Sequence, residues 1–264
     1  MGKTSHITWT DATWNIARGC TKVDAECKFC YMYRDAERFK FDAKAVIRTK
    51  QAFNMPLKLK TPSKIFTCSL TDFFHEGIDS YRHEAWDIIR QCPHHTFQIL
   101  TKRPERILQC LPEDWGEGWD NVWLGTSCGS QLGVERIYKL CEVPAKTRFV
   151  SFEPLIQAID NLPWGAGFPV DYDASPVVMW SDLIHWAIIG GESGNEKGKY
   201  LYRPCSLLWI EDIAQKCQNE NIPVFVKQMG THLQKQMGMK ERHGGNIEEF
   251  PEWLKIREFP KHLK

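Results

Sequence analysis

The stretch KIFTCSLTDFFHEGIDSYRHEAWDIIRQCPHHTFQILTKRPERI, residues 64–107, contains the pattern that decides the fold. It opens with an apolar run, Lys64–Ser69, and a second apolar run follows at Thr96–Thr101. Between the two runs, Tyr81–Cys92 has apolar side chains at helical spacing, and Pro104 then opens the next expected helix. The stretch therefore predicts a strand, a crossover helix and a second, parallel strand.

The same alternation continues on both sides of this stretch. Further apolar runs are Asn121–Thr126, Thr147–Phe152, His185–Gly190 and Pro223–Lys227. A weaker run lies within Ile7–Ile16. Further expected helices are Val134–Cys141 and Ser206–Asn219. Runs that are apolar on both faces suit the buried strands of a parallel sheet, so we expect an α/β fold with right-handed crossovers. A full or partial (β/α) barrel is the leading architecture. A doubly wound sheet is second, because no G-x-G-x-x-G follows a strand.

The domain organisation follows from the same pattern. We expect one barrel domain over residues 1–230 and a polar, charged C-terminal extension over residues 231–264. The stretch 161–181 is rich in Pro, Gly and Asp, which predicts a loop insertion within the domain. No apolar run reaches about 18 residues, and the first residues lack the apolar segment of a signal peptide. We therefore expect a soluble, cytoplasmic protein that has no membrane partner.

Three of the ten cysteines are crowded together at Cys20, Cys27 and Cys30, whereas the other seven are scattered. Their spacing is compatible with three kinds of site. A structural zinc site would need a distant fourth ligand, such as His75 or another cysteine. A reactive disulfide would use only Cys27 and Cys30. A 4Fe–4S cluster on three thiolates would leave one iron open to bind S-adenosylmethionine (SAM).

Polar groups follow most of the apolar runs at the point where each run ends. In a (β/α) barrel, the carboxyl ends of the strands meet at one mouth, where active sites are built. Charges at the ends of buried strands also need partners. The charged side chains to which this applies most are Lys102, Glu153, Glu192 and Lys227.

Most of the chain resembles a family of phage and prophage proteins that is grouped with the radical-SAM enzymes. In Cys27-Lys28-Phe29-Cys30 the chain has the C-x-aromatic-C end of the radical-SAM motif, although its first interval has six residues instead of three. The other matching segments are ITWTDATWNIARGC, SLTDFFHEG, FQILTKRPERI, NVWLGTS, RFVSFEPL, WAIIGGESG, YRPC and VFVKQMG.

The resemblance implies a radical-SAM enzyme on a (β/α) barrel, in the cytoplasm of a bacterial host if the protein is phage-encoded. Such an enzyme holds a 4Fe–4S cluster, here on Cys20, Cys27 and Cys30. An electron donor such as a flavodoxin or ferredoxin reduces the cluster, which cleaves SAM to a 5′-deoxyadenosyl radical. The resemblance names no substrate, and no catalytic residue is identified.

The resemblance and the strand-end positions together suggest roles for individual side chains. Those expected to bind SAM are Phe29, Ser69, Thr71, Asp72, Thr126, Ser127, Glu153 and Glu192. Among these, Phe29 would pack near the adenine and Asp72 would accept hydrogen bonds from the methionine ammonium. The usual Gly-Gly-Glu is absent from the position of Asp72. Those expected to neutralise a carboxylate or phosphate of a substrate are Lys102, Arg103, Arg203 and Lys227.

The N-terminal part of the chain is basic. Residues 1–60 hold 12 Lys and Arg against 6 Asp and Glu, a net charge of +6. The basic residues after the cysteines are interleaved with Phe39, Phe41 and Phe53, a combination that suits a nucleic-acid backbone and a stacked base. A nucleic acid or nucleotide is therefore one possible substrate, and an ordinary solvated surface is the other interpretation. The alternative function is a zinc-stabilised nucleic-acid-binding module without radical chemistry.

Overall fold

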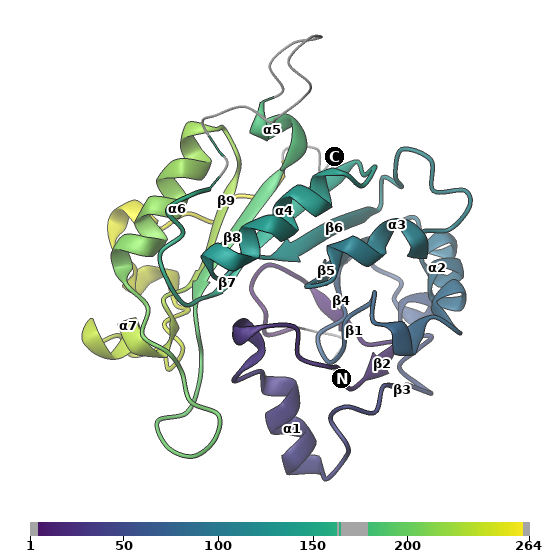
Figure 1. Ribbon diagram of the computed structural model, residues 1–264, viewed down its shortest axis with the longest axis horizontal. Helices are drawn as coiled ribbons and strands as arrows, with labels where there is room; N and C mark the ends of the chain where they lie inside the picture. The colour runs from purple at the N-terminus through teal and green to yellow at the C-terminus, as the bar shows by residue number, and fades with distance from the viewer. Residues whose placement is uncertain (1–4, 163, 165–178, 261–264) are drawn as a thin grey trace. The chain divides into compact units, whose positions relative to one another are not determined.

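Buried apolar strands form the centre of the computed structural model, which describes residues 5–162, 164 and 179–260 (Figure 1). The chain divides into two compact units: Met1–Thr126 with Glu142–Thr147, and Ser127–Cys141 with Arg148–Lys264. Most of the predicted loop insertion, residues 163 and 165–178, lies outside the described residues.

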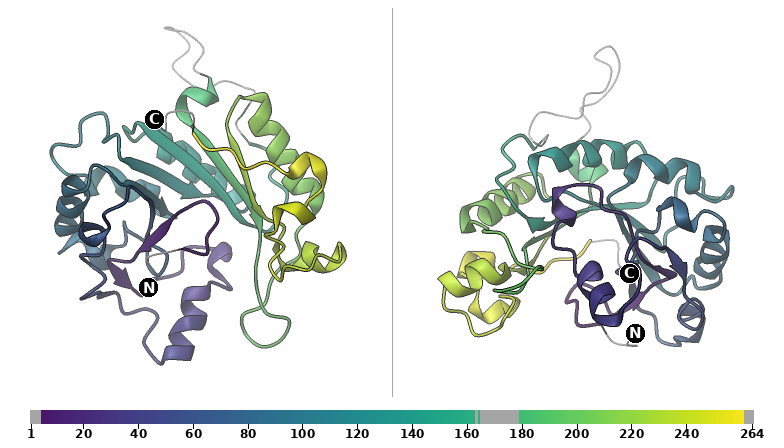
Figure 2. Two further views of the ribbon diagram at one scale, coloured as in Figure 1. Left: turned by 180° about the vertical axis from the view of Figure 1, so that it is seen from behind. Right: turned by 60° about the horizontal axis from the view of Figure 1, so that its bottom comes forward.

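The first unit carries four parallel strands in the order β1-β4-β5-β6. They are β1 (Ala12–Trp14), β4 (Lys64–Thr67), β5 (Thr96–Thr101) and β6 (Val122–Ser127), the last of which ends one residue beyond the unit. Two short strands, β2 (Ala17–Arg18) and β3 (Ile47–Arg48), pair with each other in antiparallel fashion. The described helices are α1 (Tyr31–Phe39), α2 (Arg82–Gln91) and α3 (Ile107–Cys110). Figure 2 shows α2 and α3 on one face of the parallel strands.

The second unit carries three parallel strands in the order β7-β8-β9. They are β7 (Thr147–Leu155), β8 (Trp186–Gly191) and β9 (Val224–Gln228). Its described helices are α4 (Val134–Cys141), α5 (Trp180–Leu183), α6 (Leu207–Asn219) and α7 (Gly230–Gln236). Every residue of β8 is buried, as expected for a strand that is covered on both faces.

Short 3-10 helices connect these elements. They are η1 (Ala25–Cys27), η2 (Pro56–Lys58), η3 (Glu76–Ile78), η4 (Pro104–Arg106), η5 (Gln131–Gly133), η6 (Ile247–Glu249) and η7 (Glu252–Leu254). The expected helix start at Pro104 is therefore a 3-10 turn that runs directly into α3.

The predicted α/β class with parallel strands is confirmed. In each unit, neighbouring parallel strands also follow one another along the chain, β2 and β3 aside. This is the order in which a (β/α) barrel is wound, whereas a doubly wound sheet reverses its direction. Among the described residues, no helix is long and apolar enough to cross a membrane.

The residues after α7 pack onto the second unit. The backbone N–H of Val226 donates to the carbonyl of Ile256 at 2.9 Å, and the indole N–H of Trp186 donates to the carbonyl of Glu258 at 2.8 Å. The ring of Phe259 stacks on Trp186, with 5.3 Å between the ring centres. The described part of residues 231–264 thus covers β8 and β9.

Candidate functional site

The three clustered cysteines lie on a short loop, residues 19–30, which we call the cysteine loop. Its start is bound to the segment that follows β4. The hydroxyl of Thr71 donates to the carbonyl of Gly19 at 2.6 Å, and the N–H of Gly19 donates to the carbonyl of Leu70 at 3.0 Å. Gly19 has a φ of +97°, and a Cβ there would lie 2.2 Å from the carbonyl oxygen of Ala45. Only glycine fits this entry to the loop.

Two helical turns position the second and third cysteines. Asp24 caps η1 by accepting a hydrogen bond from the N–H of Glu26 at 2.8 Å, and Cys27 is the last residue of this turn. Cys30 is the N-cap residue of α1. In the first turn of α1, the hydroxyl of Tyr33 donates to the carbonyl of Cys20 at 2.6 Å. The start of α1 is thereby tied back to the first cysteine.

The three thiols are half-buried, and none of them is in a disulfide. Burial raises the pKa of the Cys20 thiol to about 11, and Asp72 and Cys27 add to this rise while Arg103 opposes it. Burial also raises the pKa of Cys30, with a further contribution from Cys27. Cys27 thus contributes to the raised pKa of both other thiols. Within the described residues, no three His, Cys, Asp or Glu side chains converge closely enough to hold a single metal ion.

Arg103 connects the cysteine loop to the end of β5. Its Nη1 lies 3.8 Å from the Sγ of Cys20 and 3.1 Å from the Oδ2 of Asp72. Its Nη2 donates to the carbonyl and the hydroxyl of Thr21, at 2.9 and 2.8 Å. The side chains of Arg103 and Asp72 are only 9% and 8% exposed. Arg103 was predicted to bind substrate, but these contacts direct its guanidinium to the loop.

Asp72 is the centre of a buried hydrogen-bond network. Besides Arg103, it accepts hydrogen bonds from the hydroxyl of Thr101 at 2.7 Å and from the N–H groups of Phe74 and Lys102, both at 3.0 Å. Each carboxylate oxygen thus receives two donors, which uses the approximately four lone pairs of the group. This geometry disfavours the predicted hydrogen bond to a methionine ammonium and favours a positioning role.

His75 reaches the same loop from η3. Its Nδ1 accepts from the N–H of Gly77 at 2.9 Å, so in the neutral ring the hydrogen is on Nε2, which lies 3.0 Å from the hydroxyl of Thr21. Burial lowers the pKa of His75, and the charge of Arg103 lowers it further. The neutral imidazole therefore supports Thr21, and its Nε2 is already occupied as a donor.

Lys102 has a partner that sequence reasoning missed. Its ammonium lies 3.4 Å from the Oε2 of Glu26, a side chain that is fully buried within the cysteine loop. Glu26 is one of two acidic residues between Cys20 and Cys27, and only the prediction that Lys102 needs a partner pointed to such a group. The pair links the end of β5 to η1, next to Cys27.

Most of the remaining predicted SAM ligands of the first unit form hydrogen bonds or ring contacts with other residues of the chain. The hydroxyl of Ser69 accepts from the amide of Asn15 at 2.9 Å, and the carbonyl of Ser69 accepts from Tyr31 at 2.6 Å. Thr126 is fully buried and donates to the carbonyl of Thr101 at 3.0 Å. Phe29 is half-buried within the cysteine loop, with the ammonium of Lys28 5.1 Å from its ring centre.

In the second unit, Ser127 is buried at the end of β6. Three strand-end residues, Glu153, Glu192 and Lys227, form two ion pairs, one of them with Arg203 in the segment before α6. Lys227 contacts both carboxylate oxygens of Glu153, at 2.6 and 2.8 Å. Arg203 donates to Glu192 through its backbone N–H and its Nε, both at 2.8 Å, and through Nη2 at 2.5 Å. The prediction that these charges need partners is confirmed, and the partners lie within the predicted set.

A family model described as "Protein of unknown function (DUF5131)" matches residues 4–254. The chain belongs to this family. The match includes the cysteine loop, Asp72 and Arg103, and both ion pairs of the second unit. Searches of curated proteins and of solved structures found no match.

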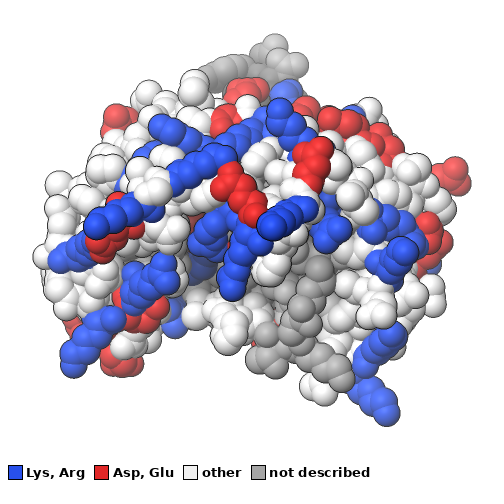
Figure 3. Space-filling model, turned by 90° about the horizontal axis from the view of Figure 1, so that it is seen from below, with Lys and Arg blue, Asp and Glu red and all other residues white. Residues whose placement is uncertain are grey.

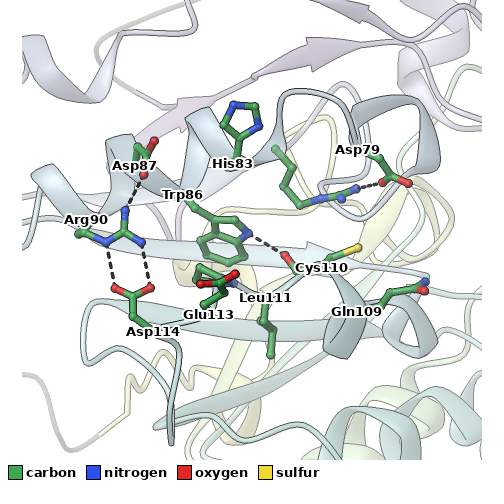
Figure 4. A pocket seen from close by; sticks show the side chains of 12 residues that line it. Asp79, His83, Trp86, Asp87, Arg90, Gln109, Cys110, Leu111, Glu113 and Asp114 are labelled. Atoms are coloured by element: carbon green, nitrogen blue, oxygen red, sulfur yellow. Dashed lines mark hydrogen bonds and ion pairs between the residues drawn. The ribbon is translucent and has the colours of Figure 1, made fainter.

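A pocket of about 530 Å³ lies elsewhere in the first unit, between α2 and the residues that follow α3 (Figure 4). Arg90 binds both carboxylate oxygens of Asp114 and also pairs with Asp87. The indole N–H of Trp86 donates to the carbonyl of Cys110 at 2.8 Å. These polar groups of the lining bind one another, whereas the cysteine loop carries three cysteines that are in no disulfide, so the cysteine loop is the better candidate site.

Proposed function

We propose that this protein is a radical-SAM enzyme in which Cys20, Cys27 and Cys30 hold a 4Fe–4S cluster. The observation that carries the proposal is the presence of three half-buried thiols on one loop, with the guanidinium of Arg103 beside the first of them. The loop precedes a series of parallel strands and helices, which is where the radical-SAM superfamily has its cysteines.

The donor set fits such a cluster better than it fits a zinc ion. Each thiolate of a 4Fe–4S cluster binds a different iron, so the sulfurs need not converge on one point. A structural zinc ion needs four close ligands, and His75, one of the expected options for the fourth, has its Nε2 directed at Thr21. Among the described residues, no other cysteine completes a close ligand group with this loop. When bound and reduced by an external donor, the cluster would supply the electron that cleaves SAM to methionine and a 5′-deoxyadenosyl radical.

The chain's own residues would position these groups. Thr71 and Gly19 fix the start of the cysteine loop, and Asp72 holds Arg103 against it. Phe29, on the same loop, is proposed to pack against the adenine of SAM.

The proposed reaction gives a direct expectation. After anaerobic reconstitution with iron and sulfide, addition of SAM and dithionite should release 5′-deoxyadenosine, which chromatography can quantify. The preparation should be brown and contain iron and sulfide. A colourless preparation that contains zinc and leaves SAM intact would contradict the proposal and favour the zinc-stabilised module.

The surface next to the cysteine loop favours a nucleic acid or nucleotide as the substrate. Phe39 at the end of α1 is 64% exposed, and the guanidinium of Arg38 lies 5.3 Å from its ring centre. Exposed aromatic rings beside cations suit stacked bases and phosphates. Phe53, by contrast, is buried, so its predicted role in base stacking is wrong. Lys and Arg are numerous on the face drawn in Figure 3, with Asp and Glu between them.

Oligonucleotide binding should therefore weaken steeply as salt increases, because each neutralised phosphate releases counterions. Replacing Arg38, Lys40 and Lys44 together by Gln should reduce the slope of log affinity against log salt by roughly one unit per lost phosphate contact. Fluorescence anisotropy at several salt concentrations measures this slope.

A matched control carries the same number of Gln substitutions in the second unit, at Lys235, Lys240 and Arg242. Its salt slope should equal that of the wild type. If both variants have the wild-type slope of log affinity against log salt, the substrate is a small molecule or a peptide instead. The same conclusion would follow if the wild type showed no salt-dependent oligonucleotide binding at low ionic strength.

A further inference from the structure

The guanidinium of Arg103 makes a contact that anchoring the cysteine loop does not require. Two hydrogen bonds from Nη2 to Thr21 already hold the loop, and the contact with Asp72 already pairs the charge. Nη1 is nevertheless shared between Asp72 and the sulfur of Cys20, at 3.1 and 3.8 Å. A buried positive charge therefore sits beside one of the three thiols.

The surrounding network keeps the guanidinium in this position. Asp72 is held by Thr101 and by the N–H groups of Phe74 and Lys102, so its carboxylate cannot turn away without losing these bonds. Because the Arg103 side chain is only 9% exposed, water screens its charge poorly. A permanent charge and a directed N–H group thus act on the Cys20 sulfur.

We propose that Arg103 is a positioning residue that raises the reduction potential of the cluster, an inference that rests on the proposed function. Reduction adds one electron to the cluster, supplied by dithionite or by a low-potential donor protein, and neither a proton nor a ligand leaves. Hydrogen bonds to cluster sulfurs and nearby charge are among the factors that set such potentials. The N–H group and the positive charge stabilise the more negative, reduced cluster.

The test is a redox titration of the reconstituted protein, followed by the EPR signal of the reduced cluster. In Arg103→Met, the ratio of reduced to oxidised cluster at a fixed potential should fall about tenfold, which is about 59 mV for a one-electron couple. Arg103→Lys keeps the positive charge but loses the planar guanidinium with its several N–H donors. It should therefore lower the reduction potential by less than Arg103→Met does. It also provides the measurement if Arg103→Met fails to fold.

Arg106→Met is the matched control. Arg106 is three residues away, and its guanidinium binds Asp79 and the carbonyl of Phe74. This variant should titrate like the wild type. If the Arg103 variants bind the full amount of iron and their clusters have the wild-type reduction potential, the inference is overturned and the proposed function stands. A wild-type protein that takes up no iron and sulfide would instead overturn the proposed function.

Discussion

Replacing Cys27 by Ala is expected to remove most of the iron and sulfide that the wild-type protein binds after anaerobic reconstitution. The reason is that each cysteine of the loop would supply one of only three protein thiolates, so the loss of one leaves two irons without a protein ligand. Cys20→Ala and Cys30→Ala should have the same effect. Colorimetric iron and sulfide assays per chain, together with the visible spectrum, measure it.

Cys141→Ala is the matched control, since Cys141 is another half-buried cysteine that is in no disulfide, located in α4. It should keep the full iron content, as should variants of the buried Cys92 and Cys217. A Cys27→Ala protein that retains the full cluster and cleaves SAM normally would show that the ligand assignment is wrong.

Asp72→Ala is expected to destabilise the fold by about 3–5 kcal/mol, because it leaves the buried guanidinium of Arg103 without its carboxylate. The hydroxyl of Thr101 and the N–H of Lys102 would lose their acceptor as well. Urea denaturation of the reduced, metal-free protein measures this difference. Because the protein is metal-free, this measurement does not depend on the identity of any cofactor.

Two controls make this result specific. Asp114→Ala removes the carboxylate of an exposed pair with Arg90 and should leave the denaturation midpoint close to that of the wild type. The double variant Asp72→Ala/Arg103→Ala should be less destabilised than the sum of the single variants, because the unpaired charge is gone. A midpoint shift for Asp72→Ala as small as that for Asp114→Ala would contradict the buried pairing.

The strands were predictable because their pattern is local. The run Thr96–Thr101 coincides with β5, and β7 extends the predicted run Thr147–Phe152 only at its end. In contrast, β2 and β3 have two residues each, too few to show a period of two. Their pairing depends on contacts between segments that are far apart in the chain.

The candidate site was predictable only in part. The crowding of Cys20, Cys27 and Cys30 and the need of strand-end charges for partners are visible in the sequence. Which charge meets which is not visible, because Lys102 could pair with any acidic residue until folding brings Glu26 beside it. Arg103 was likewise predicted to bind substrate, because the sequence does not show that folding places its guanidinium against the cysteine loop.

The sequence by itself determined the α/β class, the positions of the parallel strands and the three neighbouring thiols, because hydrophobic periodicity and ligand spacing act over short distances along the chain. Only the tertiary structure decided that the carboxylate of Asp72 accepts four hydrogen bonds and that the guanidinium of Arg103 lies beside the sulfur of Cys20. Hydrogen bonds and charge pairing depend on distances of about 3 Å between side chains, and only the packing of segments remote in sequence sets those distances.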